Sequence, residues 1–226
     1  YTLSLHDALP ISVEEIAAFH DGAVMAPIRV YVGRRAADTA EERAQLALDE
    51  LIRVGGFARS TLVVAVPVGT GWMDPGGHDT LDFMLAGDVA TVAVQYSYLT
   101  SVLALLAHPE YGIEQARALF DAVYAHWVEL PGDARPRLYV HGLSQGAFNS
   151  QMTLPLLDML GDPIAGGLWA GSPFISPFWQ RVRDERHLDS PAWRPVYGNS
   201  SLARVLNQDG AGREIDAPWG PIRFVF

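Results

Sequence analysis

Apolar, β-branched runs recur along the chain and alternate with segments of helical spacing. Runs such as TLVVAVPV and VATVAV are almost wholly apolar, as strands covered on both faces of a sheet should be. We predict strands, in chain order, at Ile28–Gly33, Thr61–Val68, Val89–Tyr98, Arg137–Ser144, Ile164–Phe174 and Ile222–Phe226.

The segments between these runs repeat their apolar positions at steps of three and four. Thr39 and Glu42 have the spacing of a capping box, and a helix that starts there should end at Gly55–Gly56. A longer helix is predicted over Ile113–Trp127. We expect further helices over Asp79–Leu85, from about Ser101, and over Gln145–Leu160 with a break at Pro155.

This alternation predicts one α/β domain, built on a mostly parallel sheet with helices on both faces. The Pro-, Trp- and Arg-rich stretch 176–220 holds no period for long, so we expect an excursion with short helices at most. The uncharged stretch Val89–Ala107 has the length of a membrane span, but its polar middle favours a strand followed by a helix.

The two ends of the chain differ from the rest. Residues 1–12 read YTLSLHDALPIS, which fits neither period and looks like translated sequencing-adapter sequence, so we interpret them as non-native. The domain then covers residues 13–226. Its last strand stops at Phe226, and we expect the domain to be truncated at the C-terminus.

Composition narrows the chemistry that is available. The 226 residues include no cysteine, and all 16 basic residues are arginine, which excludes cysteine nucleophiles, cysteine-bound metals and a P-loop lysine. A formal net charge of −10 argues against nucleic-acid binding. No metal-ligand spacing such as H-E-x-x-H occurs, so we predict no metal and no cofactor.

The clearest chemical signal is the pentamer Gly142-Leu143-Ser144-Gln145-Gly146, a G-x-S-x-G. It lies between a predicted strand and a predicted helix, the setting of a nucleophile elbow. The turn is so tight that the positions flanking Ser144 must be small, hence Gly142 and Gly146. The amides of the following helix point at the place where an oxyanion would form, and the Gln145 amide is one candidate donor.

A glycine-rich loop, VPVGTGW, follows the second predicted strand. In serine hydrolases of this kind the second oxyanion donor comes from such a loop, and Gly71 or Trp72 is our candidate. The alternatives are an ordinary glycine-rich turn or the start of a dinucleotide-binding motif. The dinucleotide motif lacks its third glycine, because position 74 is Asp.

These residues resemble a bacterial α/β-hydrolase-like domain found at the C-terminal end of polytopic membrane proteins of unknown function. The similarity covers about Ala26 to Phe226, and its most specific blocks are ALFDAVYAHW and RLYVHGLSQGA. The resemblance implies an α/β-hydrolase fold, a three-layer sandwich, with Ser144 as the nucleophile. It also implies a parent protein in the cell membrane, anchored by segments absent from this chain, whereas the chain itself should be soluble.

A serine nucleophile needs a histidine base and a carboxylate, which follow it in this fold. We expect both beyond Phe226, so that the chain alone would be inactive. His187 is the one histidine after Ser144, and a solvated surface position is the simpler interpretation. His141 should lie near the site without a catalytic role, and we expect surface or capping positions for His78 and His108.

The sequence therefore predicts a serine hydrolase or acyl-transfer domain acting on a small ester or acyl substrate. The alternative is a non-catalytic hydrolase-fold domain that binds or regulates within a membrane protein. A nucleotide-binding domain is a third, more distant hypothesis.

Overall fold

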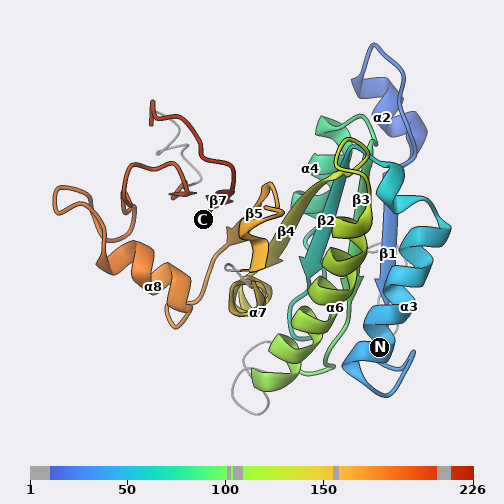
Figure 1. Cartoon of the computed structure of the whole chain (residues 1–226), viewed down its shortest axis with the longest axis horizontal. Coiled ribbons are helices and arrows are strands. Elements are labelled where there is room, and N and C mark those ends of the chain that lie inside the picture. Colours follow the sequence, from blue (N-terminus) through green and yellow to red (C-terminus); the bar gives the residue numbers. More distant parts are fainter. Residues whose placement is uncertain (1–10, 101–102, 104–108, 155–157, 208–214) are drawn as a thin grey trace.

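A computed structural model describes residues 11–100, 103, 109–154, 158–207 and 215–226. Within these residues, seven strands form a single sheet in the order β1-β3-β2-β4-β5-β7-β6, and every neighbouring pair is parallel. The strands run in one direction, so that their carboxyl ends lie at one edge (Figure 1). This is the parallel α/β sheet that the sequence predicts.

The four central strands are the apolar runs of the sequence analysis. Every residue of β2 and β3 is buried, because helices cover the middle of the sheet. The strands are β1 (Ile28–Val32), β2 (Thr61–Val66), β3 (Val89–Val94), β4 (Arg137–Leu143), β5 (Gly166–Ala170), β6 (Ala203–Arg204) and β7 (Arg223–Val225).

Helices cover both faces of the sheet. On one face α3 (Ala40–Arg53), α6 (Pro109–Glu129) and α7 (Gln145–Thr153) share the main apolar core with the sheet. The opposite face carries α4 (Pro75–Met84), which packs on a smaller apolar cluster of β2 and β3. The predicted three-layer arrangement is confirmed.

Helix α3 begins where the sequence predicts. Thr39 accepts a hydrogen bond from the Glu42 amide at 3.1 Å, and the Glu42 carboxylate accepts one from the Thr39 amide at 3.1 Å. Both bonds of a capping box are therefore present. The helix ends at Arg53, and Gly55 follows with a φ of +76°, a value that favours glycine.

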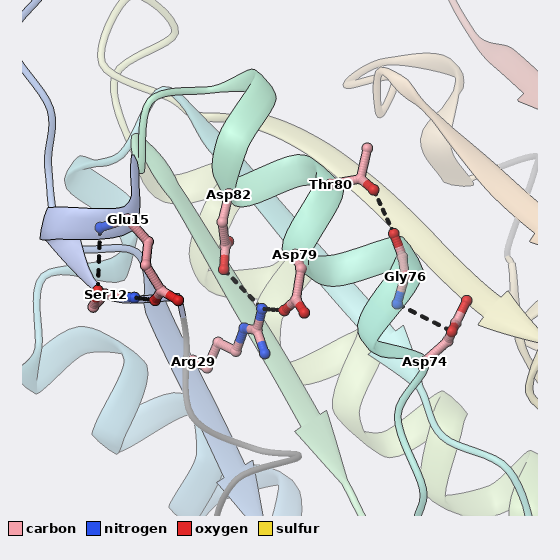
Figure 2. A network of polar contacts seen from close by, with 8 residues as sticks. All are labelled: Ser12, Glu15, Arg29, Asp74, Gly76, Asp79, Thr80 and Asp82. Carbon is pink, nitrogen blue, oxygen red and sulfur yellow. Dashed lines mark hydrogen bonds and ion pairs between the residues drawn. The ribbon is translucent and has the colours of Figure 1, made fainter. Parts of the chain in front are cut away.

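Helix α4 begins four residues earlier than the sequence analysis placed it. The Asp74 carboxylate accepts a hydrogen bond from the Gly76 amide at 3.2 Å, and Pro75 occupies the first helical turn, where its missing N–H costs nothing (Figure 2). The sequence analysis began this helix at Asp79, although the Asp-Pro pair before it is a helix start signal.

The polar side of α4 is tied to the sheet through Arg29 of β1. Its guanidinium donates to Asp79 at 2.5 Å and to Asp82 at 2.7 Å (Figure 2). Asp82 is almost fully buried, so its ion pair is shielded from solvent.

A short helix, α2 (Val13–Phe19), precedes β1. Ser12 is its N-cap and forms a capping box with Glu15 (Figure 2). Residues 1–10 lie outside the described residues, so the interpretation of the first twelve residues as non-native remains a prediction.

Single-turn 3₁₀ helices lie earlier in the chain, at Gly56–Ala58 and Asp158–Leu160. The stretch 176–220 contains α8 (Pro177–Asp184) and the two-residue strand β6. The chain returns to the sheet at β7, where Phe224 stacks on buried Trp169 with ring centroids 4.6 Å apart.

Several predicted helix ends differ from the structure. Helix α6 extends past both predicted ends, and α7 stops at Thr153 rather than Leu160. Pro155 and most of the helix expected from Ser101 lie outside the described residues. In the part of the chain that is described, no helix is both long and apolar enough to cross a membrane.

Candidate active site

Ser144 lies between the end of β4 and the start of α7, at the carboxyl edge of the sheet. Its backbone has φ +52° and ψ −116°, a region that non-glycine residues occupy only at a cost of about 1–3 kcal/mol. Two backbone hydrogen bonds hold this conformation. The Ser144 amide donates to Ala170 at 2.9 Å, and the Ser144 carbonyl accepts from Phe148 at 3.1 Å.

The two flanking glycines are required by close backbone contacts. A Cβ atom on Gly146 would lie 2.1 Å from the carbonyl oxygen of Val66, at the end of β2. A Cβ atom on Gly142 would lie 2.4 Å from the Gly146 carbonyl carbon. The turn brings β4, α7 and the end of β2 so close together that no side chain fits at either position.

The strained turn leaves Ser144 exposed, whereas the following residues of α7 are buried. The Ser144 hydroxyl makes no hydrogen bond with any other described residue. Ser144 is thus an exposed serine at the amino end of a nine-residue helix. The first amides of α7, from Gln145 on, have no acceptor inside their own helix, and the helix dipole adds positive potential there.

The loop after β2 is folded on itself by two backbone hydrogen bonds. The Val68 amide donates to Trp72 at 3.2 Å, and the Gly71 amide donates to Val68 at 2.8 Å. Of the two donors suggested by the sequence, Gly71 therefore has its N–H already bound in this conformation. The Trp72 amide has no partner among the described residues, so Trp72 is the better candidate.

Two side chains from neighbouring strands hold this loop in place. Tyr31 of β1 donates its hydroxyl to the Gly71 carbonyl at 2.8 Å, and Gln95, just after β3, donates its amide to Thr70 at 2.8 Å. Gly71 has φ +88°, and a Cβ there would lie 2.4 Å from the Tyr31 hydroxyl. Burial raises the pKa of Tyr31 above its usual range, so its hydroxyl stays protonated as a donor.

Gln95 also joins the other loops at this edge. Its amide donates to the Ser97 carbonyl at 3.0 Å, and its carbonyl accepts from the Arg34 amide at 3.2 Å. One side chain thus links the loops that follow β1, β2 and β3. Sequence analysis missed Tyr31 and Gln95, because their role depends on which strands are neighbours in the sheet.

The histidines are placed differently from the sequence expectations. His78 was expected at the surface or in a cap, but it lies on the buried side of α4 with only 2% of its surface exposed. Its ring meets that of His141 edge-on at 5.2 Å. His187 is exposed, and His108 lies outside the described residues.

The environment keeps the buried pair uncharged. Burial, reinforced by His141 and Arg29, lowers the pKa of His78 to about 3. Burial also lowers the pKa of His141, whose Nδ1 lies 3.0 Å from the Leu168 carbonyl. His141 lines a cavity of about 390 Å³ between α4 and the sheet, so it faces the layer beneath α4.

Comparison with known proteins fits this architecture. Residues 28–226 match the family model described as the Alpha/beta-hydrolase family, and the chain belongs to this family. No curated protein matches the chain in sequence.

Among solved structures, the chain is similar to one reported with LipS and LipT, two metagenome-derived lipolytic enzymes. The identity is 20%, the TM-score is 0.31, and the similarity covers 64% of this chain. It covers 55% of that chain, so the present chain spans about half the length of the solved structure it matches.

Proposed function

We propose that this hydrolase-fold chain is the nucleophile-bearing domain of a serine hydrolase that cleaves or transfers acyl groups from small esters. The observation that carries the proposal is the geometry of Ser144. A strained backbone, which costs stability, presents one exposed hydroxyl at the amino end of α7. Strain of this kind persists where the surrounding structure enforces it, and it is concentrated at functional sites.

In the proposed reaction the Ser144 oxygen attacks the ester carbonyl carbon and forms a tetrahedral intermediate. The Gln145 amide and the Trp72 amide would stabilise the oxyanion as the carbonyl oxygen gains charge. The proton lost by the Ser144 hydroxyl passes through the base to the alcohol, which leaves. Water then hydrolyses the acyl–serine ester, which releases the carboxylic acid and restores the Ser144 hydroxyl. The histidine and carboxylate that activate the serine are expected from outside the described residues.

The family resemblance extends the proposal to the cellular setting. On the strength of this resemblance we propose that the chain is part of a larger membrane protein, anchored by segments other than those described. Ester or lipid-like substrates would suit such a membrane-anchored parent protein.

A specific observation favours a second candidate, a non-catalytic binding domain. No histidine among the described residues forms a hydrogen bond with the Ser144 hydroxyl. A hydrolase fold without a base would bind ligands at the same edge of the sheet and leave them intact.

Hydrolysis of 4-nitrophenyl butyrate by the full-length protein distinguishes the two candidates. For the hydrolase, Ser144→Ala lowers kcat at least about a thousand-fold, because the nucleophile is lost. Ser201→Ala, which removes a serine hydroxyl far along the chain, should leave kcat unchanged. Equal rates for wild type and Ser144→Ala would reject the hydrolase and favour the binding domain.

A further inference from the structure

A second cavity, of about 480 Å³, opens at the carboxyl ends of β1 and β3. Its wall includes Arg34, Arg35 and Asp38 from the loop after β1, and Tyr96 and Tyr98 from the segment after β3. This is the same edge of the sheet that carries Ser144.

The wall of this cavity carries more positive than negative charge. Its arginines bring two guanidinium groups, and the one carboxylate in the lining belongs to Asp38. The Arg34 guanidinium has no hydrogen bond or ion pair with any described residue, although the Arg34 backbone is anchored to Gln95. A half-buried guanidinium without a counter-ion is a ready partner for a ligand anion.

A third arginine lies directly behind the wall. Arg43 of α3 is only 5% exposed and donates to the carbonyls of Ala37 and Asp38 at 2.9 and 3.0 Å. Its side chain thus fixes the loop that carries Arg34 and Arg35. It also adds a buried positive charge behind the lining.

Tyrosine rings shape the opposite side of the cavity. The guanidinium carbon of Arg35 lies 5.3 Å from the centre of the Tyr98 ring, a cation–π arrangement that orients the arginine. Tyr96 is buried, and its hydroxyl neighbours the Asn149 side chain of α7. Tyr96 therefore connects the wall of the cavity to the helix that follows Ser144.

The spacing of the strands sets how far the cavity lies from Ser144. β3 and β2 lie between β1, which leads to Arg34, and β4, which leads to Ser144, so the ends of β1 and β4 are about 14 Å apart. A ligand of moderate length can therefore reach from the arginines to the serine.

We propose that this cavity binds an anionic group, a carboxylate or a phosphate monoester, at the far end of the ester whose carbonyl meets Ser144. This rests on the proposed function, since it names the class of ester that the Ser144 site would accept. The arginines would hold the anion. The part of the ligand that joins the anion to the ester would cross the loop after β2.

Binding to the full-length Ser144→Ala variant tests the site without turnover. Monomethyl suberate and dimethyl suberate share one skeleton and differ by one negative charge. Calorimetry should show monomethyl suberate binding at least about tenfold more tightly, with an advantage that shrinks as NaCl is raised. Hexyl phosphate, titrated in parallel, shows whether the cavity prefers phosphate to carboxylate.

Added to that variant, Arg34→Gln should reduce the affinity for monomethyl suberate to that for dimethyl suberate. Arg35→Gln, at an exposed position, should reduce it in the same direction. Arg53→Gln is the matched control, because Arg53 is exposed at the far end of α3; this variant should bind like its parent. Equal affinity for the two suberate esters, or no effect of Arg34→Gln and Arg35→Gln, overturns the site.

The proposed function can fail separately from this site. If the charged ester binds through Arg34 but the wild-type protein does not hydrolyse esters, the anion-binding site is supported and the proposed hydrolase activity is rejected. If esters are hydrolysed but the negative charge of the ester makes no difference to its affinity, the hydrolase activity is supported and the anion-binding site is rejected.

Discussion

At the scale of single residues, the backbone of Ser144 is the most informative feature. A positive φ at a serine raises the free energy of the folded state. Close packing of β4, α7 and the end of β2, with no side chain between them, holds Ser144 in this conformation. The amino acids at positions 142 and 146 are therefore fixed by packing, independently of any reaction.

Gly146→Ala tests that packing. The added methyl would lie 2.1 Å from the Val66 carbonyl oxygen, so β2 or α7 must shift, and we expect a loss of about 1–3 kcal/mol in the free energy of unfolding. Urea denaturation measures this loss. Gly161→Ala is the control, because nothing lies within 4 Å of its added methyl. Equal stability of the two variants would contradict the described turn.

The buried His78 makes a prediction about pH. Its folded-state pKa of about 3 lies below the value of about 6.5 expected in the unfolded chain, so unfolding takes up a proton between these two values. The free energy of unfolding should therefore decrease as the pH falls through this window, by up to about 1.4 kcal/mol per pH unit.

Replacing His78 by Gln should flatten this dependence, whatever it does to the stability at neutral pH. Urea denaturation at about pH 6.5, 5.5 and 4.5 gives the slope. His187→Gln, at an exposed histidine, should keep the wild-type slope. An unchanged slope in His78→Gln would show that His78 is not buried in its neutral form.

At the scale of elements, the parts with strong local signals could be predicted from sequence. The Thr39–Glu42 spacing predicted the start of α3, and the apolar runs predicted the six longer strands. β6 could not be predicted, because two residues carry no period. The Tyr31 and Gln95 contacts with the loop after β2 could not be predicted either, since they depend on the strand order.

The N-cap of α3 gives a prediction at this scale. Thr39→Ala removes the side-chain oxygen that accepts from the Glu42 amide, and should destabilise the protein by about 1 kcal/mol. Thermal or urea unfolding measures the change. Thr80→Ala, at an exposed threonine inside α4 and not at its N-cap, is the control and should not destabilise the protein. Equal effects of the two substitutions would argue against the cap.

At the scale of the whole molecule, the stretch 166–226 completes one edge of the sheet through an aromatic cluster. Trp169 of β5 is fully buried and contacts Phe178 of α8, Phe224 of β7 and Phe226. The sequence predicted strands on both sides of the excursion. It did not show that Phe178 of α8 packs against aromatic rings of both strands, because that contact joins segments distant in sequence.

Removing the centre of this cluster should destabilise the entire domain. Trp169→Ala is expected to cost about 3–5 kcal/mol, because it leaves a large cavity among fixed rings. Urea denaturation followed by far-UV circular dichroism should show one transition at lower denaturant. Trp193→Ala, at a tryptophan that is 67% exposed, should change little. A second, separate transition in Trp169→Ala would show that the edge folds independently of the centre.

The most direct test of the central claim is covalent labelling of the full-length protein with a fluorophosphonate probe. The account predicts that wild type is labelled on the peptide containing Ser144, and that Ser144→Ala is not labelled above background. Equal labelling of wild type and Ser144→Ala, or label found at another serine, would contradict it.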